Sequence, residues 1–153
     1  VYKRQAIYSN QVKWLNNIII YPFAASLNNG DEKIRISDSS CGGNSISDID
    51  LPNPDRFENI NLVKIDDLIF GSNFLKGRKI SFIKIDIQGY ELLALRGAIE
   101  TIKENKPIII CEVMTSFYSN EEKIDSFLKL IGYEKVISIG KDRIYKFSKK
   151  EKV

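Results

Sequence analysis

Hydrophobic positions are arranged most regularly in the second half of the chain. Apolar residues occupy nearly every position of residues 80–86 and of residues 108–113, which is typical of buried strands. Between these runs, residues 91–105 carry apolar side chains at helical spacing, and Pro107 cannot continue that helix. The pattern therefore predicts a strand, a helix and a second strand.

A further helix and two short strands are predicted after this unit. The helix begins at a capping box formed by Ser119 and Glu122 and ends at Gly132. Residues 134–139 and 143–147 then form the two strands of a hairpin at the sheet edge. Because strand and helix alternate twice before the hairpin, the sequence predicts an α/β fold with parallel crossover units.

The first half of the chain has weaker signals. Residues 6–17 have the spacing of a helix end, and residues 18–23 form a continuous apolar run that predicts a buried strand. The Asn-Gly pair at 29–30 is a strong turn signal. We therefore expect residues 33–37 to form a short strand that pairs back through this turn.

Residues 38–61 are rich in Ser, Asp, Gly, Asn and Pro. We interpret this segment as a long polar surface loop, although loops of this length also serve as lids or binding loops. After it, residues 62–65 predict a short strand and residues 66–70 a helical turn.

Composition and charge exclude several classes of protein. The 153 residues are enough for one domain, and 23 basic against 20 acidic residues leave a net charge of +3, too slight to indicate nucleic-acid binding. No apolar run approaches the roughly 20 residues of a membrane-spanning helix, and no signal peptide is expected. Cys41 and Cys111 lack metal-ligand spacing, so a cytoplasmic, reducing location fits best.

Histidine is absent from the chain, which limits its chemistry. Nucleophile systems that depend on Ser-His or Cys-His pairs, and the usual zinc sites, are excluded. Acid–base chemistry must use Asp, Glu, Lys or Tyr, and no metal site is predicted.

Two acidic residues lie at the ends of the predicted buried strands. Asp86 ends the first and Glu112 the second, and ligands of open α/β sheets bind beyond such strand ends. Gly89 permits a tight turn, and Glu91 falls in the first turn of the next helix. Simpler roles stay open: Asp86 caps the helix, Glu91 only complements its dipole, or Glu112 pairs with a surface lysine. These residues alone indicate an α/β domain with an acidic crevice.

The stretch FIKIDIQGYELLALRGAIETIKENKPIIICEV, residues 82–113, resembles the signature of the FkbM-type methyltransferase family. That signature is a strand, D-x-[E/Q]-G-x-E, a helix carrying L-x-G-A, then K-P and a strand ending in Glu. More weakly, residues 17–37 resemble the family's third strand and its following turn. The matching signature residues are Asp86, Gln88, Gly89, Glu91, Leu95, Gly97, Ala98, Lys106, Pro107 and Glu112.

This resemblance implies a methyltransferase that uses S-adenosylmethionine and methylates a hydroxyl oxygen of a small molecule or a carbohydrate. It makes Asp86 the first candidate for a carboxylate near the acceptor, with Glu112 and Glu91 behind it. Five cofactor-binding residues are implied: Ala24, Ala25 and Ser26 near the adenine, and Ile87 and Gln88 near the methionine end.

The chain departs from the family pattern at its beginning. Neither a glycine-rich D-x-G-A-x-x-G loop nor a following strand ending in an acidic residue is present. We therefore expect residues 1–153 to form a partial, Rossmann-like class I methyltransferase domain that lacks the first two strands and their loop. Residues 1–5 carry no readable pattern and are either non-native or the edge of a cut.

An incomplete sheet has consequences. We expect residues 18–23 to lack their native neighbour, residues 80–86 to form an unpaired edge, and the chain alone to bind S-adenosylmethionine poorly. The alternative interpretation is a non-catalytic α/β module, or an inactive fragment that acts only through a partner. The sequence predicts no particular acceptor or oligomeric state.

Overall fold

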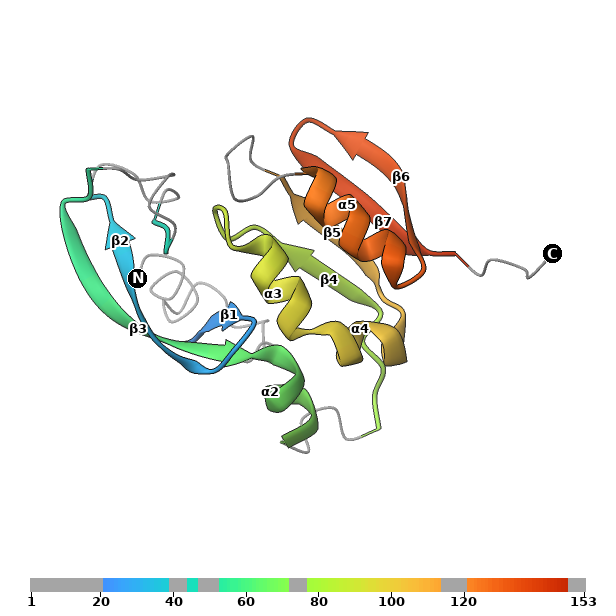
Figure 1. Cartoon of the computed structure of the whole chain (residues 1–153), viewed down its shortest axis with the longest axis horizontal. Coiled ribbons are helices and arrows are strands. Elements are labelled where there is room, and N and C mark those ends of the chain that lie inside the picture. The colour runs from blue at the N-terminus through green and yellow to red at the C-terminus, as the bar shows by residue number, and fades with distance from the viewer. Residues whose placement is uncertain (1–20, 39–43, 47–52, 72–76, 114–120, 149–153) are drawn as a thin grey trace, which may run out of the picture.

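The structure, a computed structural model, describes residues 21–38, 44–46, 53–71, 77–113 and 121–148. Within these ranges the chain forms seven strands and four helices (Figure 1). The strands make two sheets, one of three strands in the order β1-β3-β2 and one of four in the order β4-β5-β7-β6. The predicted α/β class is confirmed, but the described strands are divided between two sheets.

The four-stranded sheet contains the strands predicted for the second half of the chain. Strands β4 and β5 run parallel, and β6 and β7 form an antiparallel hairpin joined to β5 through β7. Among the described strands β4 has no second neighbour, as expected of an unpaired edge. In spatial order the strands are β4 (Phe82–Ile85), β5 (Ile108–Glu112), β7 (Asp142–Phe147) and β6 (Tyr133–Ile139).

Three helices pack against one face of this sheet: α3 (Glu91–Gly97), α4 (Ile99–Asn105) and α5 (Glu121–Leu130) (Figure 1). Each of their fully buried apolar side chains stabilises the fold by about 1.5–3 kcal/mol. The core therefore lies between these helices and the sheet. Its fully buried members include Leu95, Ile102, Ile109, Cys111, Ile124, Leu128 and Tyr145.

The end of α5 agrees with the prediction. Gly132 has φ +89 and donates its N–H to the carbonyl of Lys129, which terminates the helix. Ser119, the predicted cap at the other end, lies outside the described residues.

The single helix predicted for residues 91–105 was wrong, because the structure breaks it at Ala98. Asp66, which is 4 % exposed, causes the break. Its carboxylate accepts the N–H groups of Glu100 at 3.1 Å and of Thr101 at 2.9 Å, which in a continuous helix would bond to backbone carbonyls. A second helix therefore begins there.

The three-stranded sheet differs most from prediction. It consists of β1 (Ala24–Ser26), β3 (Arg56–Lys64) and β2 (Gly30–Ile36), with β3 in the centre. Strand β1 begins directly after the predicted strand 18–23, of which residues 18–20 lie outside the described residues. It is parallel to β3. Residues 21–23 form no strand, so the expectation that residues 18–23 lack their native neighbour stays a prediction.

Two further corrections concern β2 and the polar loop. Strand β2 pairs with β3 and not with β1, so the predicted hairpin was wrong. Asn29 explains this arrangement: its Oδ1 accepts the N–H of Lys64 at 2.8 Å, which ties the turn to the end of β3. Because β3 begins at Arg56, the loop assigned to residues 38–61 is shorter than predicted. The predicted helical turn is α2 (Ile65–Gly71).

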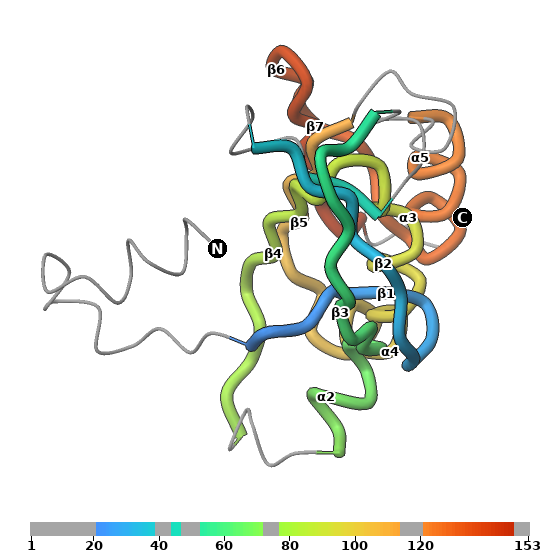
Figure 2. The backbone as a smooth tube through the Cα atoms, turned by 90° about the vertical axis from the view of Figure 1, so that its left-hand side faces the viewer, coloured from blue at the N-terminus to red at the C-terminus, as the bar shows by residue number. Residues whose placement is uncertain are grey.

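The two sheets meet at α3. A Cβ atom on Gly97 would lie 1.9 Å from the carbonyl oxygen of Ser26, so only glycine allows this approach of helix to strand. At the other end of α3, the Ser45 hydroxyl donates a hydrogen bond to the Gln88 carbonyl at 2.7 Å. Figure 2 shows the three-stranded sheet crossing in front of α3, with β4 and β5 beyond.

Candidate functional site

Strand register places Asp86 beside Glu112. Ile85 of β4 pairs with Cys111 of β5, and each acidic residue follows directly along its strand. A side-chain hydrogen bond with Asp86 is the main cause that raises the pKa of Glu112, and burial adds to it. The structure therefore brings these two predicted residues together at the carboxyl ends of the parallel strands.

Other charged and polar groups complete this acidic cluster. Asp142 is the β7 partner of Glu112 in the sheet. Lys84 Nζ lies 4.0 Å from Asp86 Oδ2 and 3.8 Å from Asp142 Oδ1, distances of weak ion pairs. Gln88 Nε2 donates a hydrogen bond to Asp86 Oδ1 at 3.2 Å, which orients that carboxylate.

Two of the simpler roles can now be compared with the geometry. The residue that caps α3 is Tyr90, without a side-chain hydrogen bond, so Asp86 does not cap the helix. Glu112 contacts Asp86, although Lys141 also acts on it and lowers its proton affinity in part. Asp86 is exposed and Glu112 half-buried, so a ligand can reach both.

Glu91 differs from the other two acidic candidates because its side chain is fully buried. Its Oε1 accepts the backbone N–H groups of Ile87 at 3.3 Å and Gly89 at 3.0 Å. Among the described residues its Oε2 has no hydrogen-bond partner. Glu91 therefore faces the inside of the loop that carries Asp86 and is not open to solvent.

The five predicted cofactor residues fall into two separate groups. Ala24, Ala25 and Ser26 form β1, and Ser26 lies against Gly97 at the end of α3. Ile87 and Gln88 precede the start of the same helix, whose seven residues span about 10 Å. The described part of the chain does not gather these two groups around one cavity.

Sequence reasoning missed several residues around the acidic pair. Lys84 was signalled only as the one cation inside an apolar strand, and Asp142 only as a turn residue of the hairpin. Ser45 carried no local signal, since its contact with Gln88 joins segments 43 residues apart. Asp142 reaches the acidic pair through the pairing of β5 with β7, and Ser45 reaches Gln88 through the packing of the two sheets.

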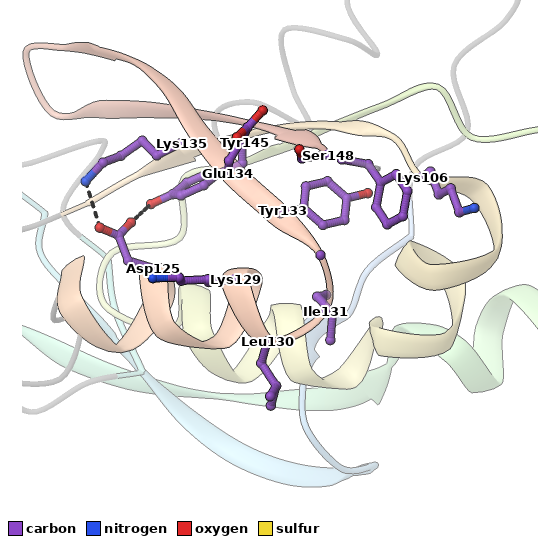
Figure 3. A pocket seen from close by; sticks show the side chains of 12 residues that line it. Lys106, Asp125, Lys129, Leu130, Ile131, Tyr133, Glu134, Lys135, Tyr145 and Ser148 are labelled. Carbon is purple, nitrogen blue, oxygen red and sulfur yellow. Dashed lines mark hydrogen bonds and ion pairs between the residues drawn. The ribbon is translucent and has the colours of Figure 1, made fainter. Parts of the chain in front are cut away.

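A cavity of about 780 Å³ lies elsewhere, between α5 and the β6–β7 hairpin (Figure 3). Tyr133 and Phe147, with ring centroids 5.7 Å apart, form part of its wall. Tyr133 donates its hydroxyl hydrogen bond to the carbonyl of Pro107, at the start of β5, whereas the acidic pair lies at the opposite strand end. This cavity is therefore separate from the candidate site.

Two other features are absent from the described part of the chain. The described residues contain no group of three or more side chains placed to hold a metal ion. None of the described helices is long and apolar enough to cross a membrane.

Acidic side chains at the carboxyl ends of the parallel strands β4 and β5 are typical of the ligand-binding edge of an α/β protein. The sequence model of the Methyltransferase FkbM domain matches residues 9–135 of the 153-residue chain. The chain belongs to the FkbM methyltransferase family, which confirms the resemblance found in its sequence. Searches of curated proteins and of solved structures gave no significant match.

Proposed function

We propose that this family member transfers a methyl group from S-adenosylmethionine to a hydroxyl oxygen of a small molecule or a carbohydrate. The observation that carries this proposal is the Asp86–Glu112 pair at the carboxyl ends of β4 and β5. A cytoplasmic location, and an acceptor other than nucleic acid, belong to the same proposal.

The chemistry assigned to this chain is proton transfer and orientation. Bound S-adenosylmethionine supplies an electrophilic methyl group. When the acceptor oxygen bonds the methyl carbon, the carbon–sulfur bond of the donor would break and its electron pair would leave with the thioether S-adenosylhomocysteine. The acceptor oxygen would lose its proton to the Asp86 carboxylate. Gln88 holds Asp86 in place, and Glu112, whose pKa is raised by Asp86, shares the negative charge of the pair.

The described residues fit the acceptor better than the cofactor. Asp86 is exposed at the strand end, where a hydroxyl can approach. Ser26 is 4 % exposed and its carbonyl lies against Gly97, so it offers little to an adenine ring. We therefore expect isothermal titration calorimetry to find weak or undetectable binding of S-adenosylmethionine to the 153-residue chain. Tight binding would contradict this expectation.

The test of the function is Asp86→Asn in the full product of the gene, assayed with S-adenosylmethionine and a panel of hydroxylated acceptors. Loss of a general base is expected to lower turnover by about 10²–10⁴-fold. Glu104→Gln is the matched control, because Glu104 is an exposed carboxylate of α4 away from the pair. Unchanged turnover in Asp86→Asn would remove Asp86 from the mechanism.

A non-catalytic α/β module remains the second candidate. The separation of Ser26 from Gln88 along α3 favours it, because the described residues do not form a complete cofactor cradle. Failure of the full product to methylate any acceptor or to bind S-adenosylmethionine would support this candidate over the enzyme.

A further inference from the structure

The loop between β4 and α3 has an unusual backbone. Gln88 has φ +54 and Gly89 has φ +95, two consecutive residues in the left-handed region. Glycine adopts this conformation freely, but for glutamine it is uncommon and must be held by its surroundings.

Glu91 supplies one of the two restraints on this loop. One carboxylate oxygen, Oε1, accepts the N–H groups of Ile87 and Gly89, the residues on either side of Gln88. The peptide unit between Asp86 and Ile87 and the one between Gln88 and Gly89 are thus both fixed from inside the protein. The second restraint is Ser45, whose hydroxyl donates to the Gln88 carbonyl at 2.7 Å.

The restrained loop determines where the site residues point. With its backbone held in this conformation, Gln88 directs its amide to Asp86 Oδ1 at 3.2 Å. Asp86 is in turn held beside Glu112 across the strand ends. A buried carboxylate is thus linked to an exposed one through a single intervening residue, Gln88.

We propose that Glu91 is a positioning residue: its carboxylate fixes the loop of residues 86–90 so that Asp86 is presented to Glu112 and to the acceptor. The role in catalysis rests on the proposed function, whereas the effect on the loop does not. Glu91 itself is fully buried and touches no acceptor. Its Oε2 is buried without a hydrogen-bond partner among the described residues. Such an unsatisfied oxygen lowers the stability of the fold.

Two variants separate hydrogen bonding from charge. Glu91→Leu keeps most of the side-chain volume but removes the acceptor for both amides. Glu91→Gln removes the charge but keeps a carbonyl oxygen that can accept them. Glu104→Leu on the surface of α4 is the matched control.

The first measurement is hydrogen exchange of the Ile87 and Gly89 amides by nuclear magnetic resonance in the 153-residue chain. We expect exchange to become about tenfold faster in Glu91→Leu, and to stay within about threefold of wild type in Glu91→Gln. Glu104→Leu should leave both amides unchanged. Unchanged exchange in a folded Glu91→Leu chain would overturn the proposal.

The second measurement is the titration of the Glu112 carboxyl group. In Glu91→Leu its pKa should fall toward the ordinary value because Asp86 is no longer held beside it, whereas Glu91→Gln should preserve the raised pKa. A substitution that only weakened the fold would not change the pKa of Glu112 in one variant and preserve it in the other. Equal pKa values of Glu112 in all variants would overturn the proposal.

The wild-type chain supplies a third measurement if Glu91→Leu does not fold. Its Ile87 and Gly89 amides must then exchange at least about tenfold more slowly than unstructured amides. Unprotected amides would overturn the proposal. None of these measurements uses an acceptor or cofactor, so a failure of the positioning role is distinguishable from a failure of the methyltransferase function.

Discussion

Two carboxylate clusters on the four-stranded sheet have opposite electrostatic character. In the acidic cluster, Glu112 lies beside Asp86, which raises the pKa of Glu112. In the other, on the face covered by α5, Glu121 accepts bonds from Arg143 at 2.7 and 2.9 Å and from Lys135 at 2.6 Å. There the pKa of Glu121 falls to about 2, chiefly because of Arg143.

The difference separates a structural role from a functional one. In the cluster of Glu121 and Asp125, each carboxylate has a cation or hydroxyl partner. Asp125 accepts hydrogen bonds from Lys135 and from the Tyr145 hydroxyl (Figure 3). This network ties α5 to the β6–β7 hairpin. In the acidic cluster, carboxylates face one another, which raises proton affinity and costs stability, and such arrangements are concentrated at functional sites.

The largest expected effect concerns Cys111, which lies behind the acidic cluster. Burial first, and then the charges of Glu91, Asp142, Glu112 and Asp86, raise the pKa of this thiol to about 12. In a Cys41→Ser chain, Cys111 should react with iodoacetamide at pH 8 on the order of a thousandfold more slowly than a free thiol. Fast labelling of the folded chain would contradict the burial of Cys111 behind the acidic cluster.

The next effect is a loss of stability in Arg143→Met. The Arg143 side chain is 16 % exposed and binds both oxygens of Glu121, so its loss should lower the free energy of unfolding by about 1–3 kcal/mol. Chemical denaturation measures this value. Lys103→Met, which breaks the exposed pair with Glu100, is the control and should cost less than about 0.5 kcal/mol.

A smaller effect is the pH dependence contributed by Glu121. Its pKa is lowered from 4.5 to about 2 in the folded chain, so its stabilisation is present above pH 4.5 and is lost as the pH falls toward 2. Because the side chain is partly exposed, we expect about 1 kcal/mol or less. Stability of wild type and Glu121→Gln, measured from pH 7 to pH 2, should converge at the acid end.

The smallest effect has the opposite sign. The pKa of Glu112 is raised in the folded chain, so the folded state binds its proton more tightly and loses stability as the pH rises through that raised pKa. Glu112→Gln should therefore be slightly more stable than wild type at pH 7. A destabilised variant would mean that Glu112 is a structural partner like Glu121.

The sequence predicted elements with local signals and failed where pairing was long-range. The turn at Asn29 was recognised, but its tie to Lys64, 35 residues away, placed β3 between β1 and β2. The helix break at Ala98 could not be predicted either, because its cause, Asp66, comes from another element. Local periodicity contains neither fact.

The candidate site also contains residues that the sequence could place and residues that depend on long-range contacts. Asp86 and Glu112 could be placed at one crevice because strand ends of neighbouring parallel strands meet. The burial of Glu91 and the contact of Ser45 with Gln88 could not, since both depend on how the loop folds back on α3 and on the second sheet.

The central claim, that Asp86 and Glu112 form one coupled pair, is tested most directly by carbon-detected titration of the Glu112 carboxyl group. In the wild-type chain its pKa should lie above the ordinary range for glutamate, and in Asp86→Asn it should fall toward that range. Glu104→Gln should leave it unchanged. An ordinary pKa for Glu112 in the wild type, or the same raised pKa in Asp86→Asn, would contradict the account.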